Sequence, residues 1–194
     1  MPRLKGADRR TLILEAAERT ILRKGLAAAT TRDVTSDLGV AAGLLAHYFS
    51  WSALRAAAFS HVIGADIERS VTGRMGEAPE TVLSDLVDGA FSVEADALWR
   101  LWLEATELGS SDPALADAAS RGTDRWQAGL SSLLARGRAA GTWACPSPDE
   151  SSWRIIAILL GLAGLCLIPG SPLSRDAATH HLRIAVRHEC GTSA

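Results

Sequence analysis

The chain has 194 residues, of which 47% are hydrophobic and 22% are charged. This composition excludes a disordered tail, a coiled coil and a disulfide-stapled miniprotein, and the length suits one mid-sized globular domain or a small domain joined to a larger one. The cysteines Cys145, Cys166 and Cys190 lack the spacing of a metal site, and the first residues lack the apolar run of a secretion signal. We therefore expect a cytoplasmic protein.

Charge is unevenly distributed along the sequence. Residues 1–60 hold nine Lys and Arg against five Asp and Glu, a balance of +4, whereas residues 61–194 hold eleven against seventeen, a balance of −6. A basic first third suggests that a polyanion binds there, and an acidic remainder indicates that this partner does not cover the whole molecule.

The first forty residues carry the patterns of two helices. Apolar residues recur at helical spacing over 8–24, and Gly25 follows as a stop signal. The pair Thr30 and Asp33 forms a capping box, in which each side chain can bond to the backbone of the other. This box predicts a second helix over 31–38.

A short third helix is expected over 42–48. Only Gly39-Val40-Ala41 separate it from the helix before, which is the spacing of a helix-turn-helix with a glycine in the turn. An ordinary helical hairpin inside a bundle is the alternative interpretation.

The rest of the chain predicts further helices, and no β-branched run with strand-like alternation interrupts them. Asp112-Pro113 and a full capping box over Ser147–Glu150 are the strongest start signals. The expected helices cover residues 52–73, 79–91, a stretch around 98–103, 113–141, 148–168 and 174–187. The fold class is therefore all-α, with about nine helices.

One helical segment has no polar face. Residues 155–168 contain no charged side chain, yet fourteen residues are too few to span a bilayer. A helix that is apolar on every side must be buried on every side, which a second copy of the chain would achieve. A central core helix of a monomer is the alternative. The candidate interface residues are Ile156, Leu159, Leu160, Ala163 and Leu167.

Four short motifs resemble a known family. Thr30-Thr31-Arg32-Asp33-Val34, Leu38-Gly39-Val40, Gly43-Leu44-Leu45 and His47-Tyr48-Phe49 together resemble the N-terminal DNA-binding domain of the TetR family of transcriptional repressors. The part from Leu98 through Asp112-Pro113 to the apolar helix is similar to the C-terminal domain of the BetI-like branch.

This resemblance implies an organisation and a function. It implies a helix-turn-helix DNA-binding domain over residues 1–51 and a helical ligand-binding and dimerisation domain over residues 52–194. The implied function is a ligand-responsive transcriptional regulator, a repressor that a small molecule releases from its operator. Ligand binding would swing the helix over 52–73 and change the spacing of the two recognition helices in the dimer.

The sequence departs from the family pattern where the family usually contacts DNA. Ala41, Ala42 and Ala46 replace polar, basic or aromatic residues, and the segment Ser50–Ala53 lacks the usual phosphate-binding lysine. Since each lost phosphate contact removes counterion release, we expect weaker operator affinity or greater reliance on the remaining basic residues. The alternative function is a dimeric small-molecule or partner-binding module whose DNA binding is weakened or lost.

The helix-turn-helix interpretation predicts which residues contact DNA. The second short helix lies in the major groove, where Leu44 would suit a thymine methyl, and the N-terminus of the preceding helix meets phosphate. The candidate DNA-binding residues are Arg3, Lys5, Arg9, Arg10, Thr31, Arg32, Gly43, Leu44, His47, Tyr48 and Arg55.

Tryptophans suggest where a small ligand binds. Five of the six lie beyond residue 98, and aromatic-lined cavities between helices are usual ligand sites. The alternative is that these side chains only pack the core. The candidate ligand-binding residues are Trp99, Trp102, Leu103, Glu107, Trp126, Leu130 and Trp153.

No catalytic signature is present in the sequence. It has no GxSxG, GxGxxG, HExxH or paired cysteine motif, and His47 has no carboxylate or Cys/His partner at a useful spacing. We expect no enzymatic activity, no cofactor and no metal. The expected partners are double-stranded operator DNA, a small-molecule effector and a second copy of the chain, with no membrane.

Overall fold

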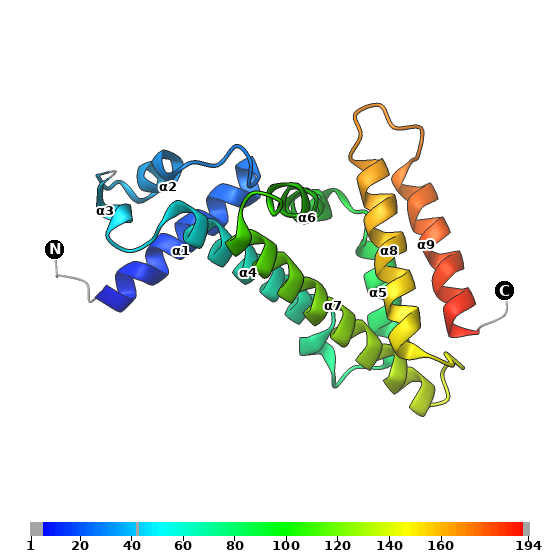
Figure 1. Cartoon of the computed structure of the whole chain (residues 1–194). Coiled ribbons are helices and arrows are strands. Elements are labelled where there is room, and N and C mark those ends of the chain that lie inside the picture. The colour runs from blue at the N-terminus through cyan, green and yellow to red at the C-terminus, as the bar shows by residue number, and fades with distance from the viewer. Residues whose placement is uncertain (1–5, 42, 192–194) are drawn as a thin grey trace. The chain divides into compact units, whose positions relative to one another are not determined.

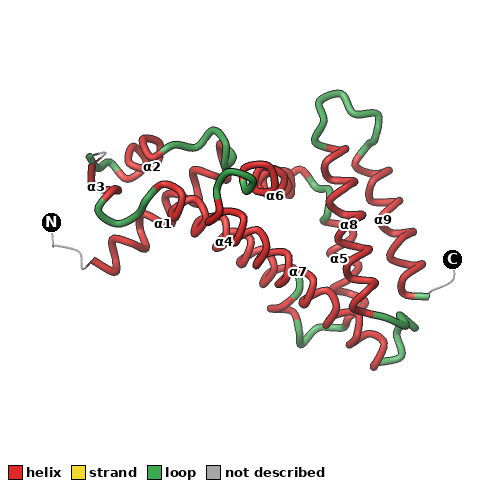
Figure 2. Tube along the Cα trace, in the orientation of Figure 1, coloured by secondary structure: helices red, strands yellow, loops and turns green. Residues whose placement is uncertain are grey.

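The computed structural model describes residues 6–41 and 43–191, and all of them lie in helices or in the turns that join helices (Figures 1 and 2). The elements are α1 (Gly6–Lys24), α2 (Thr31–Leu38), α3 (Gly43–Ala46), α4 (Trp51–Ser70), η1 (Thr72–Arg74), α5 (Pro79–Gly89), η2 (Val93–Ala95), α6 (Asp96–Leu108), α7 (Pro113–Ala139), α8 (Pro148–Cys166) and α9 (Arg175–Cys190). The expected all-α class is confirmed. None of the described helices is long and apolar enough to cross a membrane.

Two of the predicted helix starts form as expected. In the capping box of α2, the amide of Asp33 donates to the Thr30 hydroxyl at 3.3 Å and the amide of Thr30 donates to the Asp33 carboxylate at 3.0 Å. At α7, Asp112 accepts from the amide of Leu115 at 3.3 Å. Both bonds satisfy amides that a helix start otherwise leaves unpaired.

The capping box predicted over Ser147–Glu150 is wrong, although α8 does start there with Pro148 at its first position. Ser147 has ψ 83°, outside the extended conformation of a normal cap, and its side chain accepts no capping hydrogen bond. The Glu150 carboxylate instead lies 3.6 Å from the Arg154 guanidinium, one turn further along the helix.

The chain divides into two compact units. The first comprises Met1–Gly64 and Arg100–Gly122, and the second comprises Ala65–Trp99 and Thr123–Ala194. Three helices, α4, α6 and α7, therefore contribute residues to both units. The functional boundary expected after residue 51 remains a prediction.

The first unit packs α1 to α3 against the first part of α4, most of α6 and the start of α7. Its core is fully buried, and Trp102 of α6 meets Phe59 of α4 edge to face, with ring centroids 5.4 Å apart. Gly122 makes this packing possible, because a Cβ there would lie 2.9 Å from the Trp102 ring. The largest side chains in this core are Ile13, Ile21, Leu26, Leu54, Phe59, Ile63, Leu101 and Leu115.

The second unit encloses a core between α5, α7, α8 and α9, and α8 and α9 pack side by side (Figure 1). Three of the residues predicted for the dimer interface, Ile156, Leu159 and Ala163, lie in this core with at most 9% exposure, and Leu160 and Leu167 are half-buried. Their side of α8 therefore faces the protomer's own helices. The exposed apolar residues of α8 are instead Trp153, Leu165 and, just beyond its end, Ile168.

Candidate nucleic-acid interface and ligand groove

The start of α2 presents two predicted DNA-binding residues to solvent. Thr31 and Arg32 are both exposed, and the Arg32 guanidinium makes no ion pair with any described residue. The capping box fixes the backbone of this turn, so that both side chains project from a rigid helix end.

The next helix, α3, is only four residues long and is anchored by one buried side chain. Leu45 is 2% exposed, whereas Gly43 and His47 are exposed and Leu44 and Tyr48 are half-buried. The structure thus brings the exposed residues of α2 and α3 together within one helix-turn-helix (Figure 1).

Several basic side chains of α1 are used internally. The Arg19 guanidinium lies 2.7 Å from the carboxylate of Asp37, and Lys24 lies 2.5 Å from that of Asp33. These ion pairs join α1 to α2. The hydrogen bonds from Lys24 and then from Thr30 lower the pKa of Asp33 to about 2.

Two of the predicted DNA-binding residues make contacts within the protein. Arg55 has a side chain only 15% exposed, and it donates to the Asp112 carboxylate at 2.6 Å and to the Leu26 carbonyl at 3.4 Å. Arg10 donates to the Tyr48 carbonyl at 2.7 Å, with its guanidinium 4.9 Å from the centroid of the Phe49 ring. Both guanidinium groups link helices of the first unit; Arg10 is nevertheless exposed, and the contact of both residues with DNA remains a prediction. Arg9 is half-buried, and Arg3 and Lys5 lie outside the described residues.

The predicted ligand residues of α6 are divided between the two compact units. Trp99 belongs to the second unit, where its indole N–H donates to the Ala90 carbonyl at 2.6 Å, whereas Trp102 is a core residue of the first. Leu103 and Glu107 are exposed on α6.

The predicted ligand residues of the second unit differ in how far they are buried. Leu130 is fully buried, Trp126 is half-buried against the core, and Trp153 is 45% exposed on α8. Each of these positions is consistent with packing. None of the predicted ligand residues lines the groove described next, and these assignments remain predictions.

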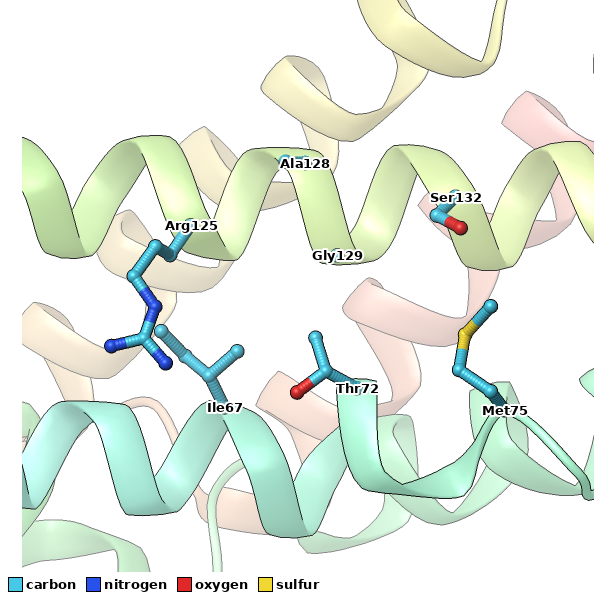
Figure 3. Close-up of a pocket in the computed structure, with 7 residues that line it drawn as sticks. All are labelled: Ile67, Thr72, Met75, Arg125, Ala128, Gly129 and Ser132. Atoms are coloured by element: carbon cyan, nitrogen blue, oxygen red, sulfur yellow. The ribbon is translucent and has the colours of Figure 1, made fainter.

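That groove lies in the second unit, between the end of α4 with η1 and the middle of α7, and has a volume of about 400 Å³ (Figure 3). Its lining consists of Ile67, Thr72, Met75, Arg125, Ala128, Gly129 and Ser132. Sequence reasoning missed these residues because it searched for aromatic side chains. The two segments lie close together at Gly129, where an added Cβ would be in van der Waals contact with the Thr72 methyl, at 3.4 Å.

The two ends of the groove differ. At one end the Arg125 side chain reaches from α7 toward Ile67, as Figure 3 shows, and it makes no ion pair with any described residue. At the other end, Arg136 donates to the Glu77 carbonyl at 2.6 Å and holds the segment after η1 against α7. The Thr72 hydroxyl donates to Glu68 at 2.7 Å. The groove is therefore mainly apolar, with one available cation at its edge.

Groups that could perform chemistry are few in the described part of the chain. Residues 6–41 and 43–191 contain no cluster of three His, Cys, Asp or Glu side chains that could hold a metal ion. Burial raises the pKa of the Cys190 thiol to about 12, which removes the thiolate near neutral pH.

Comparison with known proteins agrees with this arrangement. Residues 13–51 match the family of bacterial regulatory proteins of the tetR type, and residues 79–191 match the C-terminal domain of BetI-type transcriptional repressors. Among curated proteins, none matches the sequence.

Solved structures share the fold across nearly the whole chain. A TetR-family transcriptional regulator from Rhodococcus sp. has a TM-score of 0.77 at 23% identity, covering 95% of this chain and 99% of its own. A transcriptional regulator from Saccharomonospora viridis, solved in complex with choline, has a TM-score of 0.78 at 24% identity, covering 94% and 97%. The multidrug binding protein EbrR, solved with proflavin, has a TM-score of 0.64 at 18% identity, covering 91% and 99%.

An exposed helix-turn-helix joined to a larger helical unit defines a DNA-binding transcriptional regulator. The chain belongs to the TetR family and carries the C-terminal domain of its BetI-type repressors. Two of the structural neighbours were solved with small molecules, choline in one and proflavin in the other.

The lowered pKa of Asp33 predicts an acid-dependent loosening of α2. Because the folded pKa lies below the ordinary value of 3.8, ionised Asp33 stabilises the fold above about pH 4, and this contribution is lost as the pH falls to about 2. We expect Asp33→Asn to lower the melting temperature at about pH 5 and to converge with the wild type near pH 2. Asp117→Asn, at an exposed position, is the control. Parallel curves for wild type and Asp33→Asn across this range would contradict the assignment.

Proposed function

We propose that the protein is a repressor that binds its operator through α2 and α3 and leaves it when a small amphipathic molecule binds. The observation that carries this proposal is the free Arg32 guanidinium at the capped start of α2, directly before the exposed residues of α3. The proposed DNA-binding residues are Arg9, Thr31, Arg32, Gly43, Leu44, His47 and Tyr48.

Among its described residues, this surface offers few basic side chains that lack a partner within the protein. Arg10, Arg19, Lys24 and Arg55 are held by groups of the protein itself. We therefore infer an operator affinity that depends on few phosphate contacts and falls steeply when one is removed. The same observation favours a second candidate function, a regulator-derived binding module that has lost tight DNA binding.

Removal of the Arg32 guanidinium tests the proposed surface. We expect Arg32→Ala to weaken binding about tenfold on specific and random duplexes alike, and to reduce the slope of log K against log salt by about one, since one phosphate contact is lost. Fluorescence anisotropy over a salt series measures both quantities. Arg100→Ala removes an exposed guanidinium from α6 and serves as the control. Binding by Arg32→Ala at the wild-type level would exclude α2 from the phosphate contacts.

For the effector, we propose the groove between α4, η1 and α7. Its apolar lining and the Arg125 guanidinium at its edge suit a molecule with an aliphatic body and a carboxylate. Choline is the molecule in the S. viridis structure, and a cation of that kind would be repelled by Arg125. The groove also contacts the end of α4, the helix that follows the helix-turn-helix in the chain.

Decanoate is a suitable probe for this groove. We expect wild-type protein to bind decanoate more tightly than choline, and Arg125→Glu to weaken decanoate binding about tenfold or more, because a charged hydrogen bond contributes about 1.5–3 kcal/mol. Isothermal titration calorimetry measures the affinities. Arg121→Glu makes the same charge change one turn earlier on α7 and should bind decanoate normally. Equal affinity of wild type and Arg125→Glu would place the effector elsewhere.

For the homodimer, we propose the exposed apolar face of α8 and α9. Trp153 and Leu165 of α8, Ile168 just beyond its end and Ile184 of α9 are all exposed. Exposed apolar residues of this kind indicate a covered surface in the assembled protein, and α8 and α9 already pack against one another.

A charge on that face should separate the protomers. We expect Leu165→Glu to shift the protein from dimer to monomer, because the interface would have to bury an unpaired carboxylate. Val93→Glu places the same charge on η2, where Val93 is 68% exposed, and should leave the dimer intact. Size-exclusion chromatography with light scattering gives the masses. A Leu165→Glu dimer at micromolar concentration would show that the interface lies elsewhere.

We infer that the protein acts in the cytoplasm and catalyses no reaction. A DNA partner supports the first inference, and membership of a family of transcriptional regulators supports the second.

A further inference from the structure

The turn between α1 and α2 is held by a carboxylate from a distant part of the sequence. The amides of Leu26 and Ala27 both donate to Oε2 of Glu104 in α6, the second bond at 3.2 Å. Two amides that converge on one ionised carboxylate form charge-assisted hydrogen bonds, which are stronger than neutral ones. Glu104 therefore fixes the backbone immediately after α1.

Gly25 makes room for this carboxylate. A Cβ at Gly25 would lie 2.5 Å from Oε1 and 2.7 Å from Oε2 of Glu104, and the backbone of Gly25 has φ +85°, which side chains rarely adopt. The turn itself therefore favours glycine, and a side chain at this position would also displace the Glu104 carboxylate.

The same turn is held from its other side. The Leu26 carbonyl accepts from Arg55 at 3.4 Å, and Arg55 is in turn held by Asp112 at 2.6 Å. Asp112 also accepts from the Ser52 hydroxyl at 2.6 Å and caps α7 through the amide of Leu115. The bonds from Arg55 and then from Ser52 lower the pKa of Asp112, which keeps this carboxylate ionised. The N–H and the carbonyl of Leu26 are thus both held through acidic residues from outside the helix-turn-helix.

Both acidic residues come from an unexpected part of the chain. Glu104 and Asp112 lie within residues 79–191, which match the BetI-type C-terminal domain, yet they belong to the same compact unit as α1 to α3. We propose that Glu104 is a positioning residue for DNA binding. Its carboxylate orders the turn that leads into α2, and so places Thr31 and Arg32 for phosphate contact. This inference rests on the DNA-binding surface proposed above.

The test compares Glu104→Gln with the wild-type chain. The glutamine keeps the size of the side chain and removes its charge, and Asp117→Asn makes the same charge change at an exposed position of the same unit. The probe is a duplex selected by the wild-type protein from a random-sequence pool. Anisotropy over a salt series gives affinity and salt slope, hydrogen exchange gives the protection of residues 25–30, and thermal melting reports the fold.

In Glu104→Gln, we expect the amide hydrogens of Leu26 and Ala27 to exchange about tenfold faster than in the wild type. We also expect this variant to bind the duplex about tenfold more weakly, as the loss of a charged hydrogen bond implies. The salt slope should stay at the wild-type value, since no phosphate contact is removed, and this separates Glu104→Gln from Arg32→Ala. Should Glu104→Gln fail to fold, Glu104→Asp keeps the charge, shortens the reach and should show the same changes to a smaller degree.

Three results would overturn the inference. Unchanged exchange at Leu26 and Ala27 would mean that Glu104 does not hold the turn. Faster exchange with wild-type DNA affinity would mean that the turn need not be held for binding, and a reduced salt slope would mean that Glu104 acts on a phosphate contact itself. If the wild-type chain selects no sequence from the pool, the proposed DNA-binding function fails together with this inference, whereas the first three results leave that function intact.

Discussion

The buried pairing of Arg55 with Asp112 is the interaction on which the first unit depends. A guanidinium and a carboxylate that are both nearly removed from water need further hydrogen bonds. Here Ser52 and the Leu115 amide donate to Asp112 and the Leu26 carbonyl accepts from Arg55, while the Nε of Arg55 has no partner among the described residues. This requirement places α4, the start of α7 and the α1–α2 turn in one fixed arrangement. This arrangement in turn restrains α2 and α3, which carry the exposed residues.

Charge counted along a sequence differs from charge available at a surface. The first sixty residues are basic by count, but Arg19 and Lys24 neutralise the acids of α2, and Arg10 and Arg55 bind carbonyls and a buried acid. Among the described residues of this segment, few basic side chains remain without a partner in the protein, on a chain of net charge −2. Recognition by such a surface relies more on the geometry of its contacts than on long-range attraction.

Local signals in the sequence predicted most of the fold. Helical periodicity gave the helices, and the Thr30 to Asp33 box and Asp112-Pro113 gave correct starts, because these signals act within a few residues. The links that build the unit span 57 residues between Arg55 and Asp112 and 78 between Leu26 and Glu104, and no local pattern marks them. Of the predicted DNA-binding residues on α2 and α3, Thr31, Arg32 and Gly43 are exposed and Leu44 is half-buried. The groove formed by Thr72, Met75 and Gly129 has no sequence signature.

The hydrogen bonds from Leu26 and Ala27 to Glu104 have a consequence for the design of chimeric regulators. A chimera that joins residues 1–51 of this chain to the C-terminal part of a relative keeps the two amides and Gly25 but leaves their carboxylate behind. The transferred helix-turn-helix would then retain every residue proposed to contact DNA. It would still lack the Glu104 carboxylate that holds its α1–α2 turn. A chimera of this kind should therefore also carry glutamate at position 104, although 52 residues separate that position from the junction after residue 51.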